Sequence, residues 1–301
     1  MKTNSAKRLY RSGFVAILGK PNVGKSTLIN SLLGQKVAAV SARPQTTRRS
    51  QVGILTTQDA QIIFVDTPGI HQPRNKLGGK MNEAARGALQ DCDLIVWIVD
   101  ASTPPEAEDM HLAELIKSQS RTTPRIIALN KIDLIPAGDH EAVTEVYSQL
   151  LPGSPVIRLS ARNGDNLEAL LSLILEKLPA GEPFFPLGQV TDLYEREIAA
   201  DLIREAALNL LRDEVPHGIA VRIDEYQERQ TQGAYIEATL FVERESHKGI
   251  VIGQGGAMLK SIGSAARREI ESMSGRRVYL RLRVKVKKNW RDDEKALRWL
   301  G

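Results

Sequence analysis

The sequence has few of the features that mark secreted, membrane-spanning or metal-bound proteins. Cys92 is the single cysteine among 301 residues, so no disulfide can form within the chain, and we expect a reducing, cytoplasmic compartment. The longest apolar run, residues 94–99, is far shorter than the roughly 18 residues that a membrane span needs. The run at residues 14–18 is too short for a signal-peptide core. The five histidines and the cysteine show no zinc-site or nucleophile spacing.

The composition is that of a globular protein, with 42% hydrophobic and 26% charged residues. A chain of this length is expected to form two domains. Three prolines and two glycines fall within residues 179–188, a density that excludes both helix and strand. We therefore predict one domain at residues 12–178, a linker at 179–191 and a second domain at 192–301.

Positive charge is concentrated in one segment. The net charge is +5, yet residues 246–291 hold 12 Lys or Arg against two acids, a local surplus of ten. Such a block indicates a polyanionic partner, because basic side chains that neutralise phosphates release counterions. Nucleic acid and an anionic lipid surface are both open on this ground.

In the first domain, short apolar runs alternate with helical patterns. We predict strands at 13–18, 61–65, 93–99, 125–129 and 155–159, and helices at 24–33, 107–117, 141–151 and 167–178. This alternation predicts an α/β fold, with a mostly parallel sheet and helices on both faces. Residues 36–50 lack periodicity and are predicted to be a loop.

A phosphate-binding motif lies between the first strand and the first helix. It reads Gly19-Lys20-Pro21-Asn22-Val23-Gly24-Lys25-Ser26, followed by Thr27, and fits G-x4-G-K-S. In this context, backbone N–H groups and the helix N-terminus hold phosphate oxygens. Lys25 would reach the β- and γ-phosphates and Ser26 would coordinate Mg²⁺. The motif alone predicts a nucleotide without specifying the base.

Two further motifs follow later strands and point to guanine. They read Asn130-Lys131-Ile132-Asp133 and Ser160-Ala161-Arg162. The Asp133 carboxylate can accept from both N1–H and the amine of guanine, whereas adenine would leave it unpaired at a cost of about 10⁴-fold in affinity. Asn130 would either contact N7 or hold the loops together, the Lys131 stem would lie along the base, and the Ala161 N–H would donate to O6. These residues predict GTP and GDP as ligands.

A fourth motif, Asp66-Thr67-Pro68-Gly69, follows the strand at 61–65. Asp66 would hold Mg²⁺ through water, and the Gly69 N–H would contact the γ-phosphate. A threonine of the loop 36–50 would complete the metal shell, and we favour Thr47 over Thr46. The predicted catalytic residues are therefore Lys25, Thr47, Asp66 and Gly69.

These motifs, in this order, resemble the GTPase family of translation-factor-related switches over residues 13–178. Asn22 resembles the residue of a subgroup that uses K⁺, which implies that Asn22 is a K⁺ ligand. Ile70 stands where many small GTPases have the glutamine that orients water. We expect slow intrinsic hydrolysis, stimulated by K⁺, by a partner or by both. Arginines 43, 48 and 49 would be charge stabilisers or RNA contacts.

The second domain contains a regular amphipathic strand and a glycine loop. In residues 279–287, four apolar side chains face one way and Arg281, Arg283, Lys285 and Lys287 face the other. Helical patterns at 193–211 and 257–273, strands at 219–226 and 234–242, and the loop Gly253-Gln254-Gly255-Gly256 resemble an α+β KH domain of the prokaryotic type II. Its G-x-x-G loop clamps about four nucleotides of single-stranded nucleic acid. The candidate RNA-binding residues are Lys248, Gly249, Ile252, Gly253, Gln254, Gly255, Gly256, Lys260, Arg267, Arg281, Arg283, Lys285 and Lys287.

A GTPase domain followed by a KH domain resembles the Era-like family of bacterial GTPases over nearly the whole chain. The resemblance implies a GTP-hydrolysing switch that binds single-stranded RNA near the 3′ end of 16S rRNA and acts in small-subunit assembly. It also implies peripheral association at the inner face of the cell membrane, and we expect the protein to be a monomer. An alternative stays open, in which an RNA- or membrane-binding module holds GTP as a structural or regulatory ligand with little turnover. An ATP-using enzyme would leave Asp133 without a role.

Overall fold

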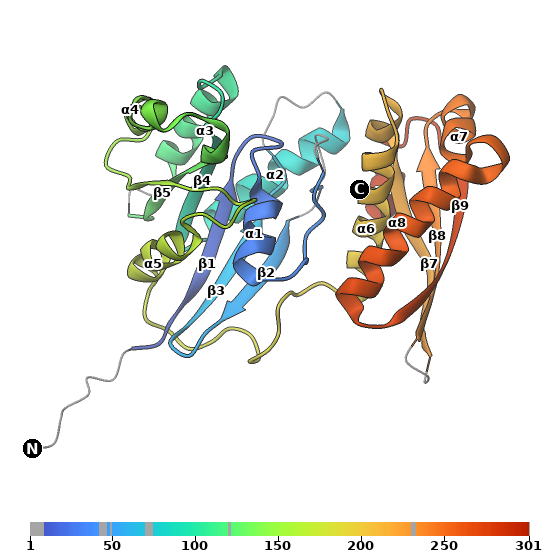
Figure 1. Cartoon of the computed structure of the whole chain (residues 1–301), viewed down its shortest axis with the longest axis horizontal. Coiled ribbons are helices and arrows are strands. Elements are labelled where there is room, and N and C mark those ends of the chain that lie inside the picture. Colours follow the sequence, from blue (N-terminus) through green and yellow to red (C-terminus); the bar gives the residue numbers. More distant parts are fainter. Residues whose placement is uncertain are drawn as a thin grey trace, which may run out of the picture. The chain divides into compact units, whose positions relative to one another are not determined.

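The computed structural model describes residues 9–41, 47–48, 50–69, 75–119, 122–229 and 233–300 (Figure 1). The chain divides into two compact units. The first comprises residues 1–34, 50–70 and 85–192, and the second comprises 35–49, 71–84 and 193–301. Two segments that interrupt the first unit in sequence therefore belong to the second.

The described part of the first unit holds a six-stranded sheet in the order β2-β3-β1-β4-β5-β6. The strands are β1 (Arg11–Leu18), β2 (Gln51–Thr56), β3 (Ala60–Asp66), β4 (Leu94–Asp100), β5 (Arg125–Asn130) and β6 (Val156–Arg158). β2 runs antiparallel to β3, and the other pairings are parallel. This confirms the predicted mostly parallel α/β sheet, although β2 itself was not predicted.

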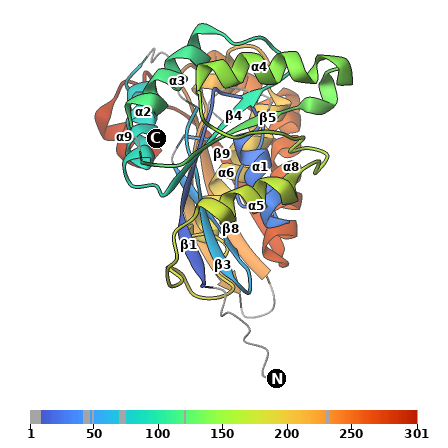
Figure 2. The same ribbon diagram turned by 90° about the vertical axis from the view of Figure 1, so that its left-hand side faces the viewer.

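Helices cover both sides of this sheet. They are α1 (Lys25–Leu33), α3 (Ala107–Ser118), α4 (His140–Leu150) and α5 (Leu167–Lys177), while α2 (Lys76–Gln90) has residues in both units. Trp97 and Ile95 of β4 pack with Leu112 and Ile116 of α3. Figure 2 shows α3 on one side of the strands and α1 and α5 on the other.

The segment predicted as a linker is bound to the edge of the sheet. The side-chain amide of Gln61 accepts hydrogen bonds from the backbone N–H groups of Phe184 (2.8 Å) and Phe185 (2.9 Å) and donates to the Phe185 carbonyl. The Ile54 N–H of β2 donates to the Val190 carbonyl at 2.8 Å. The Ile54 bond occupies a backbone group that the open edge strand β2 would otherwise expose, and the Gln61 bonds satisfy backbone groups of the linker.

The second unit has a three-stranded sheet among its described residues, in the order β7-β8-β9. Its strands are β7 (Ala220–Arg229), β8 (Gly233–Val242) and β9 (Arg277–Val286), and its helices are α6 (Glu195–Leu210), α7 (Glu245–Ile252), α8 (Ala257–Ser274) and α9 (Glu294–Leu300). β7 and β8 are antiparallel, whereas β8 and β9 are parallel. From α6 to β9 the order is helix, strand, strand, helix, helix, strand, which confirms the predicted KH arrangement.

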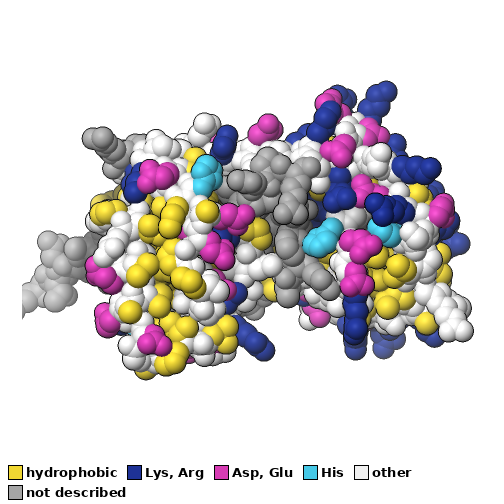
Figure 3. Space-filling view, turned by 90° about the horizontal axis from the view of Figure 1, so that it is seen from above, with side chains coloured by type: hydrophobic (Ala, Val, Ile, Leu, Met, Phe, Trp, Pro, Cys, Tyr) yellow, Lys and Arg dark blue, Asp and Glu magenta, His cyan; other side chains and the backbone are white. Residues whose placement is uncertain are grey.

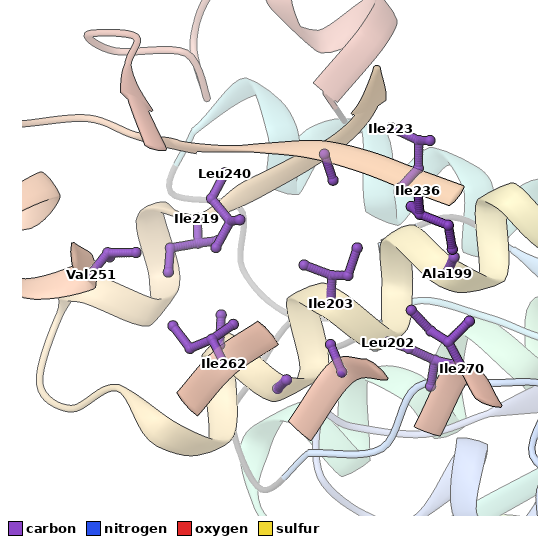
Figure 4. Close-up of a cluster of buried hydrophobic side chains, with 14 of the residues drawn as sticks. Ala199, Leu202, Ile203, Ile219, Ile223, Ile236, Leu240, Val251, Ile262 and Ile270 are labelled. Carbon is purple, nitrogen blue, oxygen red and sulfur yellow. The ribbon is translucent and has the colours of Figure 1, made fainter. Parts of the chain in front are cut away.

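The core of this unit lies between α6, α8 and one face of the sheet. Figure 4 shows Leu202 and Ile203 of α6 and Ile262 of α8 together with Ile236 and Leu240 of β8. In β9, Val278 is buried and the alternate residues Arg277, Tyr279 and Arg281 are exposed, as the sequence pattern predicts. The sheet therefore has an inner face that contacts α6 and α8, and an outer face turned away from them.

A second cluster covers one end of the outer face. Trp290, which is fully buried, packs with Phe241 and with α9, and its indole N–H donates to the Gly218 carbonyl at 2.8 Å. Leu77 and Met81 of α2 join the same cluster. Neither α2 nor α9 was predicted.

Replacing Gln61 by Ala should destabilise the first unit. The change leaves two N–H groups and one carbonyl of the linker without their partner, which costs about 1–3 kcal/mol in the free energy of unfolding. Urea denaturation measures this free energy. Gln149→Ala on exposed α4 is the matched control, with an effect of about 0.5 kcal/mol or less. Equal effects of the two variants would show that Gln61 does not hold the linker.

Candidate functional site

The predicted phosphate loop wraps around the buried ammonium group of Lys25. Lys25 Nζ donates to the backbone carbonyls of Gly19 (3.0 Å) and Lys20 (2.7 Å). The loop makes this turn with positive φ angles at Asn22 (65°) and Gly24 (105°). A Cβ atom on Gly24 would collide with the side-chain amide of Asn130, so the loop needs glycine there.

Burial lowers the pKa of Lys25 to about 8, and the negative charge of Asp66 opposes this shift. Desolvation penalises the charged form of a lysine unless an anion lies close to it. The site therefore favours an incoming anion with several oxygens, such as a phosphate chain.

Oxygen donors for a divalent cation lie beside the loop. Ser26 Oγ donates to Asp66 Oδ2 at 2.7 Å, and Asp66 at the end of β3 is only 1% exposed. Thr67 Oγ1 donates to the Ile17 carbonyl at 2.7 Å, which ties the end of β3 to β1. Hydroxyl and carboxylate oxygens are ligands that Mg²⁺ prefers, so the donor set fits this metal.

The motif Asp66-Thr67-Pro68-Gly69 at the end of β3 passes close to the phosphate loop. A Cβ atom on Gly69 would lie 2.7 Å from the backbone nitrogen of Pro21. The position accepts only glycine without a shift of the loop. The structure thus brings Gly69, Asp66, Ser26 and the phosphate loop together, while their contacts with Mg²⁺ and the γ-phosphate stay predictions.

The other predicted switch residues have different surroundings. Thr47 is 8% exposed and belongs to the second unit, and its role in a metal shell stays a prediction. Arg48 is buried with its guanidinium 5.1 Å from the Trp290 ring centre, and burial holds its pKa well below the usual value. This placement supports neither a charge stabiliser nor an exposed RNA contact. Thr46, Ile70, Arg43 and Arg49 lie outside the described residues.

Asn130 links its own loop to the phosphate loop and to the loop that contains Ala161. Its buried amide donates to the Val23 carbonyl of the phosphate loop at 2.7 Å and accepts from the Ala161 N–H at 2.8 Å. Of the two roles left open for Asn130, the geometry shows that it holds the loops together. A contact from the Ala161 N–H to guanine O6 stays a prediction.

The remaining base-site residues lie around this amide. Lys131 adopts a left-handed backbone (φ 64°), and its ammonium group forms an ion pair with Asp100. Burial raises the pKa of Asp100, but hydrogen bonds from Lys131 and Ser102 outweigh this and lower it overall. Asp133 is exposed in the helical turn after Lys131, where its carboxylate is accessible. Ser160 is buried and Arg162 is exposed in the loop after β6.

One anchor of the phosphate loop was not predicted. Lys20 Nζ forms ion pairs with Asp109 (2.7 Å) and Glu106 (2.8 Å) at the start of α3. Burial lowers the pKa of Lys20, but hydrogen bonds to both carboxylates raise it overall. No local pattern indicates this pair, because more than 80 residues separate Lys20 from the two acids.

The G-x-x-G loop of the second unit has the backbone that its glycines allow. Gly253 (φ 72°), Gly255 (φ 56°) and Gly256 (φ 82°) all have positive φ angles between α7 and α8. A Cβ atom on Gly253 would lie 2.7 Å from Met258 Cβ. Gln254 and Gly255 are exposed, so the loop presents backbone to solvent.

The candidate RNA residues divide into two sets. Lys248 lies on α7, while Lys260 and Arg267 are exposed on α8. Arg281 and Arg283 point instead from the outer face of the sheet, because their neighbours Leu280 and Leu282 pack against the inner core. Lys285 shares this alternation, whereas Lys287 follows the end of β9, where it is half-buried and forms an ion pair with Asp293 at 2.9 Å. In Figure 3, Lys and Arg side chains are more frequent over the second unit, on the right, than over the first.

Within the described residues, no three His, Cys, Asp or Glu side chains gather in a way that could hold a metal ion. No helix in that part of the chain is long and apolar enough to cross a membrane.

Comparisons with known proteins match both units. The family model for the 50S ribosome-binding GTPases matches residues 14–131, and the KH domain model matches residues 214–291. Proteins called GTPase Era from Caldanaerobacter subterraneus and Ruminiclostridium cellulolyticum are 46% and 44% identical to this chain. Each match covers 97% of this chain, and the matches cover 98% of the first protein and 97% of the second. A crystal structure of Era in complex with MgGDPNP and nucleotides 1506–1542 of 16S ribosomal RNA is 41% identical, with a TM-score of 0.92. That match covers 97% of this chain and 99% of the other.

The affinity for GTP should fall as the pH rises through about 8. Lys25 with a pKa of about 8 is charged below this pH and loses its proton above it, whereas bound phosphates stabilise the charged form. GTP binding at pH 8 should therefore take up a fraction of a proton. Titration calorimetry in two buffers of different ionisation enthalpy measures this uptake.

The Lys25→Arg variant is the control, because a guanidinium stays charged throughout this range. It should bind GTP without proton uptake, even if more weakly. Zero uptake by the wild-type protein at pH 8 would contradict the assignment of Lys25 to the phosphates.

Proposed function

Because the chain belongs to the Era family of GTPases, we propose that it is a GTP-hydrolysing switch that binds single-stranded 16S rRNA near its 3′ end. Its place of action is the assembly of the small ribosomal subunit. The observation that carries this proposal is the presence of two such groups of residues on one chain. One is the group of Lys25, Ser26, Asp66 and Asn130 at the strand ends, and the other is the glycine loop between α7 and α8.

In the first site, a few side chains have separate roles in binding the nucleotide. Lys25 neutralises the phosphates from inside the loop, and Asp133 selects guanine at the open end of the site. Ser26 and Asp66 would hold Mg²⁺, which neutralises phosphate charge when it is bound. Both residues lie within hydrogen-bond distance of each other, so they need little rearrangement to share one ion.

The segment that carries Thr47 offers a basis for switching. It belongs to the second unit, where Lys36 forms ion pairs with Glu205 (2.7 Å) and Glu269 (2.8 Å), and where Arg48 lies over Trp290. If Thr47 coordinates the metal of bound GTP, the state of the nucleotide acts on this segment. Loops of this kind order with the γ-phosphate and relax after its loss.

The proposed function also includes a K⁺ ion, a cellular compartment and an oligomeric state. Asn22 is exposed in the phosphate loop with a left-handed backbone, a position from which its side chain can reach a K⁺ ion beside the phosphates. The protein would act in the cytoplasm as a monomer, and a fraction of its molecules would associate with the inner face of the cell membrane. The positive surplus of residues 246–291 supports attraction to either polyanion.

Replacing Asp133 by Asn should move base preference from guanine toward xanthine. The amide keeps the size of the carboxylate but presents a donor, so it repels one of the guanine N–H groups. We expect GTP affinity to fall by about 10²-fold or more, with xanthosine triphosphate bound better than GTP. Competition binding with both nucleotides measures the ratio, and Asp139→Asn in the next helical turn is the control. Unchanged GTP affinity would refute the base site.

Sedimentation with purified small ribosomal subunits tests the whole function. With a non-hydrolysable GTP analogue the protein should co-sediment, and with GDP most of it should stay in the supernatant. Subunits pretreated to remove the 3′ end of 16S rRNA are the control and should not retain the protein. GTP turnover, measured in parallel, separates a switch from a module that holds GTP without hydrolysing it. No co-sedimentation in either state would exclude the subunit as the partner.

A further inference from the structure

The outer face of the sheet in the second unit carries a stacked aromatic pair among basic side chains, and one ring of the pair is exposed. We propose that this face is a second binding site for single-stranded RNA, separate from the G-x-x-G loop. Bases would stack on Tyr279, and Arg281, Arg283 and Lys285 would contact phosphates. The inference rests on the proposed RNA-binding function and adds a surface to it.

The aromatic part of the site is formed by Tyr235 of β8 and Tyr279 of β9. The two residues are directly opposite each other in the strand register, and their rings stack with centres 5.6 Å apart and planes 10° apart. Tyr279 is 64% exposed although it lies within a strand. Exposed aromatic rings on a sheet are the platforms on which single-stranded nucleic acids stack their bases.

The charged part of the site continues along β9 from the aromatic pair. Arg277, Arg281, Arg283 and Lys285 are exposed and alternate with inward-facing apolar residues. Glu237 of β8 lies under this row and pairs with Arg283 (2.5 Å) and Arg281 (3.6 Å). One carboxylate therefore fixes two guanidinium groups without cancelling the positive charge of the row.

The tyrosine pair belongs to the same arrangement. The Tyr235 hydroxyl donates to Glu237 Oε2 at 3.0 Å, so the carboxylate orients both the stacked rings and the arginines. An oriented set of rings and guanidinium groups loses less entropy when a ligand binds. The geometry is thus that of a prepared surface rather than a row of independent solvated side chains.

The chemistry of this surface favours RNA over a membrane or an apolar protein partner. The other end of the outer face is already covered, because Phe241 packs against Trp290 and Trp299. The open part presents the tyrosine pair and the cations of β9, with the carboxylates of Asp224 and Glu225 beside them on β7, and the aliphatic residues of β9 point to the inner face. Insertion into lipid needs a contiguous apolar face, whereas the aliphatic side chains of this strand pack into the inner core.

The test compares two RNAs on the full-length protein. A labelled unstructured RNA of about 20 nucleotides can reach both sites, whereas one of about five nucleotides fills the G-x-x-G loop alone. Tyr279→Ala should weaken binding of the long RNA by about fivefold or more, while it leaves the short RNA unaffected. Tyr279→Phe keeps the ring and should restore the affinity, which separates stacking from any effect on folding.

Photo-crosslinking locates the contact directly. With 5-iodouridine in the long RNA, mass spectrometry should find adducts on Tyr279 in the wild-type protein and in Gly253→Asp. The Gly253→Asp variant should lose the short RNA, because an Asp at φ 72° and ψ 172° is strained and repels phosphate. Gly153→Asp, at another positive φ angle in open space, is its control.

Four results would decide against particular parts of the proposal. Equal affinity of Tyr279→Ala and wild type for the long RNA, or no adduct on β9, would overturn the second site. Loss of binding to phosphatidylserine vesicles in Tyr279→Ala, with RNA affinity unchanged, would assign the face to lipid and overturn it as well. Normal binding of the short RNA by Gly253→Asp would count against the proposed loop site instead, so the two failures are distinguishable.

Discussion

The nucleotide site depends on the buried side-chain amide of Asn130. Its donor and its acceptor each hold a different loop, one through Val23 and the other through Ala161, while its own backbone ends β5. Without the amide, a buried carbonyl and a buried N–H would lose their partners at a cost of about 1–3 kcal/mol each. Gly24 is glycine for the same reason, since any side chain there would occupy the space of this amide. The phosphate loop and the base loops are therefore one structure.

The parts of this site that the sequence predicts are those whose chemistry requires a local pattern. The phosphate loop, the Asp66 motif and the Asn130 motif each need fixed residue types at fixed spacing after a strand, so their positions follow from the sequence. The G-x-x-G loop follows in the same way, because three neighbouring positive φ angles require glycine. The order of helices and strands in the second unit follows from periodicity.

What the sequence could not predict depends on contacts between distant residues. β2 is a short edge strand that forms a hydrogen bond with the Val190 carbonyl, and α9 is positioned by its packing with Trp290 and Phe241. The ion pair of Lys20 with Asp109 is not indicated by the sequence of either segment alone. The stacking of Tyr279 on Tyr235 needs the register of two strands, which the pattern of β9 does not contain. The membership of residues 35–49 in the second unit is likewise a property of the folded chain.

The cluster around Trp290 has a consequence for the order in which the protein matures. Its members come from residues as far apart as Leu77 and Leu300, so the cluster cannot close until the last helix has left the ribosome that makes the chain. Domains generally fold during synthesis from the N-terminus onward. The strands and helices around the phosphate loop can reach their final packing earlier, whereas Leu77 and Met81 must wait for α9. Newly made protein should thus pass through a stage in which the first unit is folded and the apolar start of α2 is still exposed to chaperones.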